Sequence, residues 1–533
     1  MKISKYIFFA FVALSFASCI EDESMEATNP ISDIVINESS LEKVYNIQKN
    51  ESLVIEPVVT QTDESLPLSY AWELDQEIYS TEKVFRYKGT KLGTFDGRLI
   101  VSNADGKAFF TFTLNVNSPY EYGITVLSKD AEGRTHIAFM QEPMKEGDKK
   151  EFYDENCIEK NNPDVVFASN PADIIHTTGT LLLACQGKDG DDKDTPTIYY
   201  LNEKTFVMED YVKSKEYPDF KPTRLLTPQG SYNGISYPVL SADGKMYSLP
   251  TFSAVLQPSH KFTSEYAQVG FAIGNDTEND IIVWDKGKND KGKATNGLAC
   301  LYNGYGPFYC GSKYLLERDS LSTDQYYTDR FSKLTGIRTL VYIHKTPEQI
   351  DKSRREFIAL VQASTAQMKA IFATFFWRDV DGTGRNYEIL DNGGFTKAAS
   401  KNYKGIDEKT PCIANATYQT MLFANGNTIK KWFYNGKVEE DKEVEGYFLD
   451  GKEDKGPEVL LTVGSSKAVI TSFDISEDHL KTYVAFYEPD QEGKNGSVWV
   501  FDTNTGEVLE QYDNVCYQPI KVIYKKKAER KKK

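Results

Sequence analysis

The chain has 533 residues, of which 40% are hydrophobic and 26% charged, and its formal net charge at pH 7 is −16. This length is too great for one ordinary hydrophobic core and predicts two or three domains. The acidic balance argues against nucleic-acid binding, which requires a basic surface, and the 33 Tyr and 30 Phe residues favour β-structure.

The first 18 residues have the pattern of a secretory signal peptide. Lys2 and Lys5 precede an apolar run over 6–14, which is too short to span a bilayer, and small residues then lead to Cys19. The sequence Leu-Ser-Phe-Ala-Ser-Cys at 14–19 resembles a bacterial lipobox, in which cleavage before the cysteine leaves it to carry the lipid. We therefore expect lipidation at Cys19; an ordinary signal peptide that ends near a cysteine is the alternative.

An acidic tether is expected over 19–32. Glu21, Asp22 and Glu23 follow the cysteine closely, and charged, apolar-poor segments of this kind stay disordered. The acidic run resembles the surface-export signal of Bacteroidetes-type lipoproteins, while a plain solvated tether is the alternative. We expect a protein at the outer membrane that is exposed at the cell surface and anchored only by lipid.

Short strands alternate with turns over 33–117. Residues 68–74 alternate between apolar and other side chains, which places Trp72 on the apolar face. The turn signal at 103–106 joins two further strands in a hairpin. This texture predicts an immunoglobulin-like β-sandwich in which Trp72 is a core anchor. The Tyr70-Ala71-Trp72 motif resembles that of PKD-like domains.

Longer repeats of strand, Gly/Asp turn and second strand follow over 118–525. The clearest repeat pairs 482–486 with 497–502. Repeats that recur roughly every 45 to 60 residues predict a β-propeller of about seven blades, with another β-rich repeat fold as the alternative. A helix starting at Thr346-Pro347 and continuing through Arg354 and Phe357 is expected as an insertion in one blade.

Residues 526–533 form a basic tail, which we interpret as a solubilising end; contact with anionic lipid is the alternative.

Six cysteines besides Cys19 permit three disulfides, and the sequence leaves their pairing open. Cys185 lies in an apolar run, where a small buried hydrophobic side chain is expected. The other five are Cys157, Cys300, Cys310, Cys412 and Cys516.

No zinc, P-loop, dinucleotide or G-x-S-x-G motif occurs, which favours a binding protein over an enzyme. His136 and His344 lie in expected strands and are interpreted as core histidines. Two acidic turns could bind Ca²⁺, one at 189–194 and one containing Asp379 and Asp381. Both are equally explained as plain turns, so no cofactor other than a possible Ca²⁺ ion is expected.

Aromatic residues crowd an expected loop at 302–310, where Gly and Pro interrupt regular structure. Loops on a rigid scaffold often carry function, and exposed rings would offer stacking faces to a ligand. The same residues could instead pack between blades. The candidate ligand-binding residues in this loop are Tyr302, Tyr305, Phe308 and Tyr309. Trp377 is a further candidate from the aromatic run 375–377, which leads into the Asp379 turn, and a buried strand end is the alternative there.

The lipobox, the acidic tether, the Tyr70/Trp72 strand and the segment 120–128 together resemble the PKD-like lipoproteins of Bacteroidetes. Ile124 stands after Gly123 where that family usually carries an aromatic residue. The resemblance implies an accessory binding or docking subunit of a SusC/SusD-type, TonB-dependent uptake complex, with other surface lipoproteins as partners. It also implies an oligopeptide ligand in preference to an oligosaccharide. A propeller hydrolase or lyase and a structural spacer are the alternatives.

Overall fold

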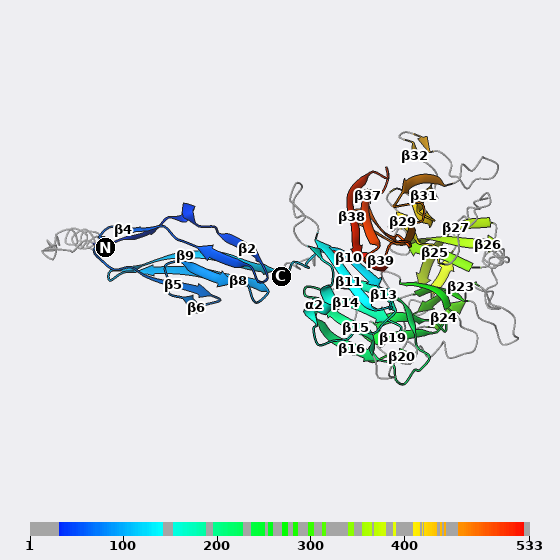
Figure 1. Cartoon of the computed structure of the whole chain (residues 1–533), viewed down its shortest axis with the longest axis horizontal. Helices are drawn as coiled ribbons and strands as arrows, with labels where there is room; N and C mark the ends of the chain where they lie inside the picture. Colours follow the sequence, from blue (N-terminus) through cyan, green and yellow to red (C-terminus); the bar gives the residue numbers. More distant parts are fainter. Residues whose placement is uncertain are drawn as a thin grey trace, which may run out of the picture. The chain divides into compact units, whose positions relative to one another are not determined.

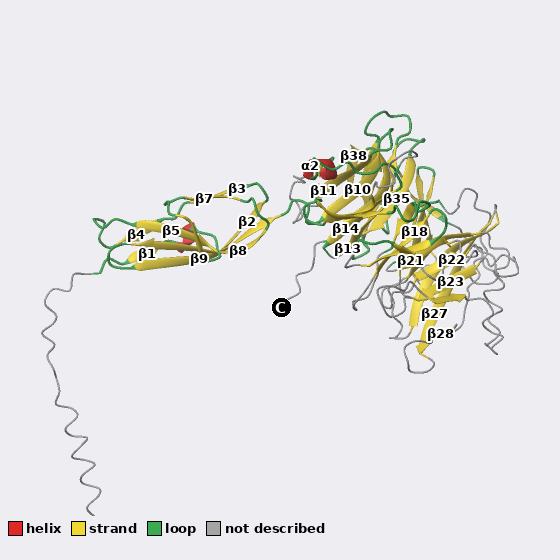
Figure 2. Ribbon diagram, turned by 90° about the horizontal axis from the view of Figure 1, so that it is seen from below, coloured by secondary structure: helices red, strands yellow, loops and turns green. Residues whose placement is uncertain are grey.

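The computed structural model describes residues 31–141, 153–187 without 178, 196–226, 236–250, 254–258 and 457–526, with shorter stretches between 269 and 443. The chain divides into two compact units, Met1–Ser118 and Pro119–Lys533 (Figure 1). The described residues are almost entirely β-structure, as expected from the composition (Figure 2). Their helical segments are short: η2 (Glu38–Ser40) and α2 (Cys157–Asn161).

The first unit is a β-sandwich. Its strands are β1 (Ile34–Ile36), β2 (Val44–Gln48), β3 (Ser52–Ile55), β4 (Val59–Gln61), β5 (Ser69–Leu74), β6 (Glu77–Ser80), β7 (Phe85–Lys88), β8 (Gly93–Ser102) and β9 (Lys107–Asn117). Five of them form a sheet in the order β2-β9-β8-β5-β6, in which β2 runs parallel to β9 and the other pairs are antiparallel. The pairs β1–β4 and β3–β7 add side chains to the same core.

The sandwich core follows from the two-residue period of its strands. In β9, Phe110, Phe112 and Leu114 are buried, whereas the residues between them face outward. Trp72 is fully buried, with its ring 4.9 Å from that of Phe85, and its indole N–H donates to the carbonyl of Glu82 at 3.0 Å. The prediction that Trp72 is a core anchor is confirmed.

The second unit contains seven four-stranded sheets in the described residues, numbered here as blades. Blade 1 consists of β10 (Gly123–Lys129), β11 (Thr135–Gln141), β12 (Tyr153–Asp154) and β39 (Gln518–Lys525); blade 2 of β13 (Pro171–Thr177), β14 (Thr180–Cys185), β15 (Pro196–Asn202) and β16 (Met208–Lys213); and blade 3 of β17 (Pro222–Leu225), β18 (Ser236–Ser241), β19 (Met246–Pro250) and β20 (Gln257–Pro258).

Four further sheets complete the series. Blade 4 consists of β21 (Val269–Gly274), β22 (Ile281–Asp285), β23 (Gly297–Tyr302) and β24 (Ser312–Leu315); blade 5 of β25 (Thr339–Lys345), β26 (Arg354–Ser364), β27 (Gln367–Asp379) and β28 (Tyr387–Leu390); blade 6 of β29 (Cys412–Asn415), β30 (Thr420–Asn425), β31 (Thr428–Phe433) and β34 (Glu458–Thr462); and blade 7 of β35 (Val469–Ile475), β36 (Lys481–Tyr487), β37 (Gly496–Asp502) and β38 (Val508–Cys516). A separate hairpin joins β32 (Val438–Glu439) to β33 (Lys442–Glu443).

The blades form a closed ring. The first strands of neighbouring blades contact each other in the pairs β13–β17, β21–β25, β25–β29 and β29–β35. Between blades 3 and 4, strand β18 contacts β21. The C-terminal strand β39 contacts both β35 and β13 and pairs antiparallel with β10, so the last strand of the chain completes the first blade (Figure 1). This arrangement is a β-propeller, the architecture expected for 118–525.

The expected helix at Thr346 is wrong in its second half. Arg354 and Phe357 lie in strand β26, where they pair with Phe376 and Ala373 of β27. The run from Phe357 to Val361 contains aromatic and β-branched residues, and the long antiparallel pairing with β27 outweighs the helical spacing that suggested a helix. The start of that segment, 346–353, lies outside the described residues.

Candidate functional site

Most of the site residues expected from the sequence lie outside the described part of the chain. These are Cys19, Tyr305, Phe308, Tyr309, Asp381 and the acidic turn 189–194. The backbone places Tyr302 at the end of β23 in blade 4, and Trp377 and Asp379 in β27 of blade 5, without describing their side chains. The proposed ligand-binding and calcium residues therefore stay predictions.

Four of the six remaining cysteines are free thiols, namely Cys157, Cys185, Cys412 and Cys516. Cys185 is fully buried and burial raises its pKa to about 12, so it is the inert hydrophobic side chain that its sequence context indicated. His136 is also buried, with its Nε2 atom 3.1 Å from Asp130 Oδ2, which confirms its interpretation as a core histidine.

Within the described ranges, no group of three or more His, Cys, Asp or Glu side chains has the placement needed to hold a metal ion. The helices in this part of the chain are all too short or too polar to cross a membrane.

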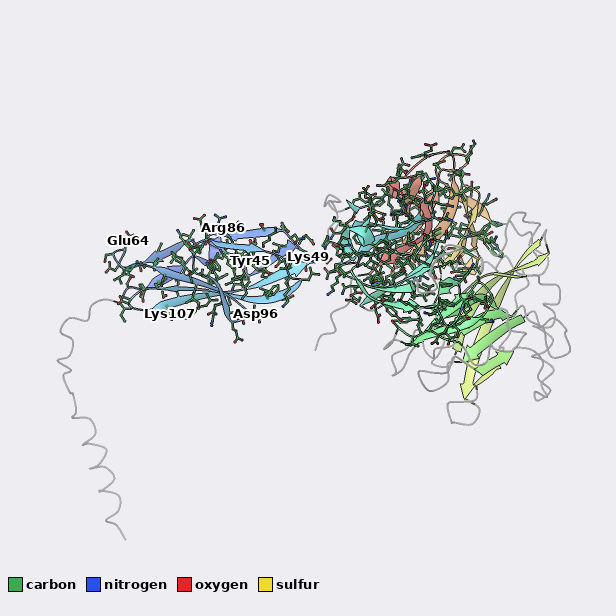
Figure 3. The ribbon with its side chains drawn as sticks, turned by 60° about the horizontal axis from the view of Figure 1, so that its bottom comes forward. Tyr45, Lys49, Glu64, Arg86, Asp96 and Lys107 are labelled. Carbon is green, nitrogen blue, oxygen red and sulfur yellow. The ribbon has the colours of Figure 1, made fainter. Side chains whose placement is uncertain are left out.

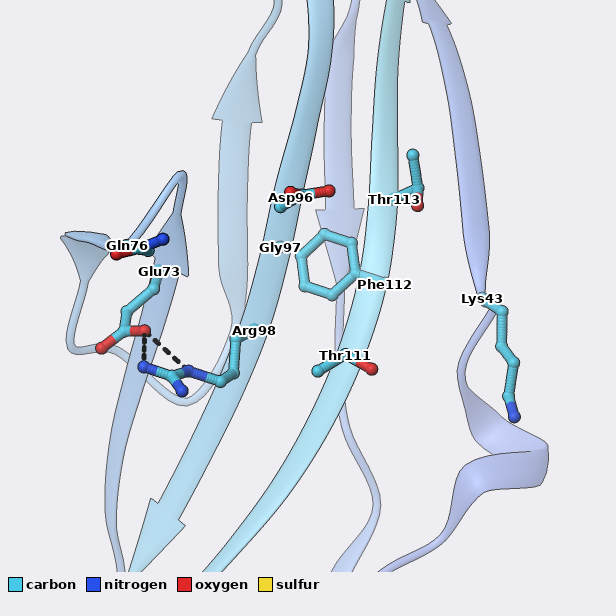
Figure 4. Close-up of a pocket in the computed structure, with 9 residues that line it drawn as sticks. All are labelled: Lys43, Glu73, Gln76, Asp96, Gly97, Arg98, Thr111, Phe112 and Thr113. Atoms are coloured by element: carbon cyan, nitrogen blue, oxygen red, sulfur yellow. Dashed lines mark hydrogen bonds and ion pairs between the residues drawn. The ribbon is translucent and has the colours of Figure 1, made fainter. Parts of the chain in front are cut away.

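A polar groove of about 470 Å³ lies on the outward face of the five-stranded sheet of the sandwich (Figure 4). Its size falls within the range of small-ligand sites. Strands β5, β8 and β9 supply its floor, and the β5–β6 hairpin and the segment before β2 supply its sides. The lining residues are Lys43, Glu73, Gln76, Asp96, Gly97, Arg98, Thr111, Phe112 and Thr113.

The groove is built by strand register. Glu73 pairs with Arg98, and Arg98 in turn pairs with Thr111, which forms one row of outward side chains across three strands. Asp96 and Thr113 form the next row. Because side chains of one face recur at every second residue, the two rows stand two residues apart along the strands. Figure 3 shows Asp96 and Lys107 on the same side of the sandwich.

The backbone between the two rows is fixed by a close contact on the core side. Gly97 lies opposite Phe112, and a Cβ atom at Gly97 would lie 2.3 Å from the Phe112 ring. The β5–β6 hairpin that flanks the groove turns through Asp75 and Gln76, both with positive φ (49° and 72°), as a two-residue hairpin turn requires. Asp75 Oδ1 accepts the backbone N–H of Asp96 at 2.9 Å and ties this turn to β8.

Glu73 and Arg98 form an ion pair in the groove. Glu73 is buried to 9% exposure, and its Oε2 atom accepts from Arg98 Nε at 2.8 Å and lies 2.5 Å from Arg98 Nη2 (Figure 4). Such charge-assisted contacts fix the plane of the guanidinium group. The Arg98 Cζ atom also lies 5.9 Å from the ring centre of Phe109, whose side chain is 56% exposed.

A second polar cluster lies where the inner strands of the propeller meet. Each inner strand is a sheet edge whose outer N–H groups need acceptors. Asp173 of blade 2 accepts the N–H of Leu225 at 2.6 Å and also holds Lys521 Nζ at 2.5 Å. The carboxylate of Asp474 in blade 7 accepts the N–H of Tyr524 at 2.5 Å.

The same arrangement recurs elsewhere around the ring: Ser472 Oγ accepts the N–H of Val522 at 3.2 Å, and Tyr342 Oη accepts that of Ala414 at 3.1 Å. Side chains of one blade therefore cap the free backbone edge of the next. Burial raises the pKa of Asp474 to about 6, as expected for a carboxyl group enclosed by protein. These groups are committed to joining the blades, so we assign them a structural role.

Sequence reasoning missed both clusters. Glu73 and Arg98 become neighbours only through the register of β5 and β8, which are separated in the chain by two other strands. Asp173 and Asp474 left a weak signal, because each is the only acidic residue of its strand. A single buried acid in a strand indicates that a polar group on a neighbouring element forms a hydrogen bond or ion pair with it.

Comparison with solved structures gives several matches. A quinonprotein alcohol dehydrogenase-like protein from Bacteroides thetaiotaomicron VPI-5482 is 13% identical, and the match covers 92% of this chain and 99% of that one with a TM-score of 0.45. Sqt1 of Saccharomyces cerevisiae is 10% identical over 74% of this chain and 83% of its own, with a TM-score of 0.37. AztD from Citrobacter koseri is 10% identical, and the match covers 86% of this chain and 98% of that one with a TM-score of 0.31.

At these identities and TM-scores, the assignment of a β-propeller rests on the sheets of this chain. No protein-family model matches the sequence, and no curated protein matches it either.

Proposed function

We propose that this chain is a lipid-anchored protein of the bacterial cell surface and acts as an accessory binding subunit of a SusC/SusD-type uptake complex. The observation that carries the binding role is the groove of the sandwich unit, which gathers charged, amide and hydroxyl side chains on one rigid sheet face. Sites on sheets are more precisely shaped than sites on loops. The propeller supplies a broad, rigid body for docking to partner proteins.

The surface location is supported by the N-terminal sequence. The segment that ends at Cys19 resembles a lipobox, and the acidic residues that follow resemble an export signal. Lipid on the cysteine would hold the chain to the membrane without a spanning segment. The family resemblance implies an oligopeptide as the cargo of the uptake complex.

Two variants test the location separately. Cys19→Ala removes the thiol needed for acylation and should release the protein from membranes. Replacing Glu21, Asp22 and Glu23 by Ala should preserve membrane attachment but abolish cleavage by protease added to whole cells. If the triple variant stays as accessible to protease as the parent, the acidic run is only a tether and the proposed export signal is wrong.

A further inference from the structure

The groove lies on the face of the sheet and not at its edge, which limits what it can recognise. The backbone groups of β8 already pair with β5 on one side and with β9 on the other. An extended peptide usually binds by adding a strand to a free sheet edge, where main-chain groups are available. In this groove only side chains can contact a ligand.

The charges that line the groove balance. Lys43 and Arg98 are positive, Glu73 and Asp96 are negative, and the remaining lining residues are neutral. Arg98 is held by Glu73, so its charge is already neutralised locally. A strongly charged ligand would meet as much repulsion as attraction here, whereas a neutral ligand with many hydroxyl groups would find both donors and acceptors.

A flat apolar surface continues from the groove. Phe109 is the outward neighbour of Thr111 on β9, more than half of its surface is exposed, and the Arg98 Cζ atom lies over its ring, 5.9 Å from the ring centre. Ile100 is paired with Phe109 on β8. An exposed ring of this kind suits the flat apolar face of a sugar, while hydroxyl groups at the sugar's rim can reach the polar side chains.

We propose that the groove of the sandwich unit binds a neutral oligosaccharide. The sugar stacks on Phe109, and its hydroxyl groups bond to Asp96, to Thr111 and to Oε1 of Glu73, since both contacts of Glu73 with Arg98 use Oε2. This ligand class rests on the binding role proposed above and goes beyond it, because it assigns the site to the sandwich unit and selects neutral sugars over peptides.

The experiment uses the purified full-length protein in detergent, with an array of neutral oligosaccharides, uronic-acid oligosaccharides and oligopeptides. The double variant Asp96→Ala, Phe109→Ala should weaken binding of the captured neutral sugar at least tenfold, with an unchanged melting temperature because both side chains are exposed. Lys107→Ala, on the same outward side of β9, is the matched control and should bind like the parent. Phe109→Tyr keeps the ring and should retain affinity.

Three results would overturn the proposal: no neutral oligosaccharide binds the parent protein, the double variant binds as well as the parent, or only peptides or charged sugars are captured. Binding in detergent needs neither a membrane nor a transporter. A failure here would therefore leave the result of the Cys19→Ala experiment standing, and loss of surface exposure in cells would not affect the array result.

Discussion

Lys525 is a lysine in the interior of the propeller unit. It ends β39 and is fully buried, and its Nζ atom donates to the backbone carbonyls of Tyr120 and Glu203. The rings of Phe139 and Phe206 lie 5.7 and 5.8 Å from the ammonium nitrogen. Burial lowers its pKa from 10.5 to about 8, since desolvation opposes the charged form.

This shift predicts how stability depends on pH. Between about pH 8 and 10.5 the unfolded chain binds more protons at this lysine than the folded chain, so the free energy of unfolding should rise with pH. The contribution over that range is on the order of 3 kcal/mol. In Lys525→Met the rise should be missing. Denaturant unfolding of both proteins from pH 7 to 10.5 measures it; a constant difference between them would contradict the assignment.

At the residue scale, the sequence predicted those side chains whose surroundings are set by their own strand. Trp72 lies on the apolar face of an alternating strand and Cys185 at the end of a continuous apolar run, so the burial of both followed from the local sequence. Glu73 and Arg98 could not be paired in advance because their contact depends on which strands are neighbours. Lys525 is the last residue of the expected propeller and stands directly before the basic tail, and its burial was not predicted because it depends on Tyr120 and Glu203, which are distant in the chain.

Among the elements, β39 has the clearest role, because it fills the place of the missing strand in blade 1. Its N–H groups are capped by Ser472 and Asp474 on one side while it pairs with β10 on the other. Together, these contacts join blade 7 to blade 1. The closure of the ring therefore depends on one strand of eight residues.

Removal of residues 518–533 should open the ring. The buried side chains of Val126 and Leu127 in β10 would become exposed along a free strand edge. We expect loss of cooperative unfolding and strong binding of a hydrophobic dye, with partial recovery when a peptide of residues 518–526 is added. Removal of residues 527–533 alone is the control. A truncated chain with an unchanged melting temperature and near-ultraviolet circular dichroism would show that closure does not need β39.

Element assignment failed where two patterns competed. The segment around Phe357 has both a helical spacing and a β-rich composition, and its strand is fixed only by pairing with the long strand β27. The local sequence does not decide between helix and strand here, because strand formation depends on a partner strand elsewhere in the chain. The all-β class could be predicted, because it depends on many segments and a wrong assignment of one segment does not change the class.

For the whole molecule, the fold class and the groove have different origins. Repeated strand pairs predicted a propeller without knowledge of any single contact, whereas the groove exists only because three strands of the sandwich align their outward side chains. The proposed function joins these parts: the sandwich binds the ligand, the propeller docks to partners, and the lipid at Cys19 keeps both at the cell surface.

The most direct test of this account is purification of the affinity-tagged protein from the outer membrane of its native host in mild detergent. We predict that a TonB-dependent transporter and a SusD-type lipoprotein co-purify in near-equal amounts, and that the Cys19→Ala variant, recovered from the soluble fraction, brings down neither. Recovery of the membrane-anchored parent protein without a transporter, under conditions in which known transporter complexes survive, would contradict the proposed function.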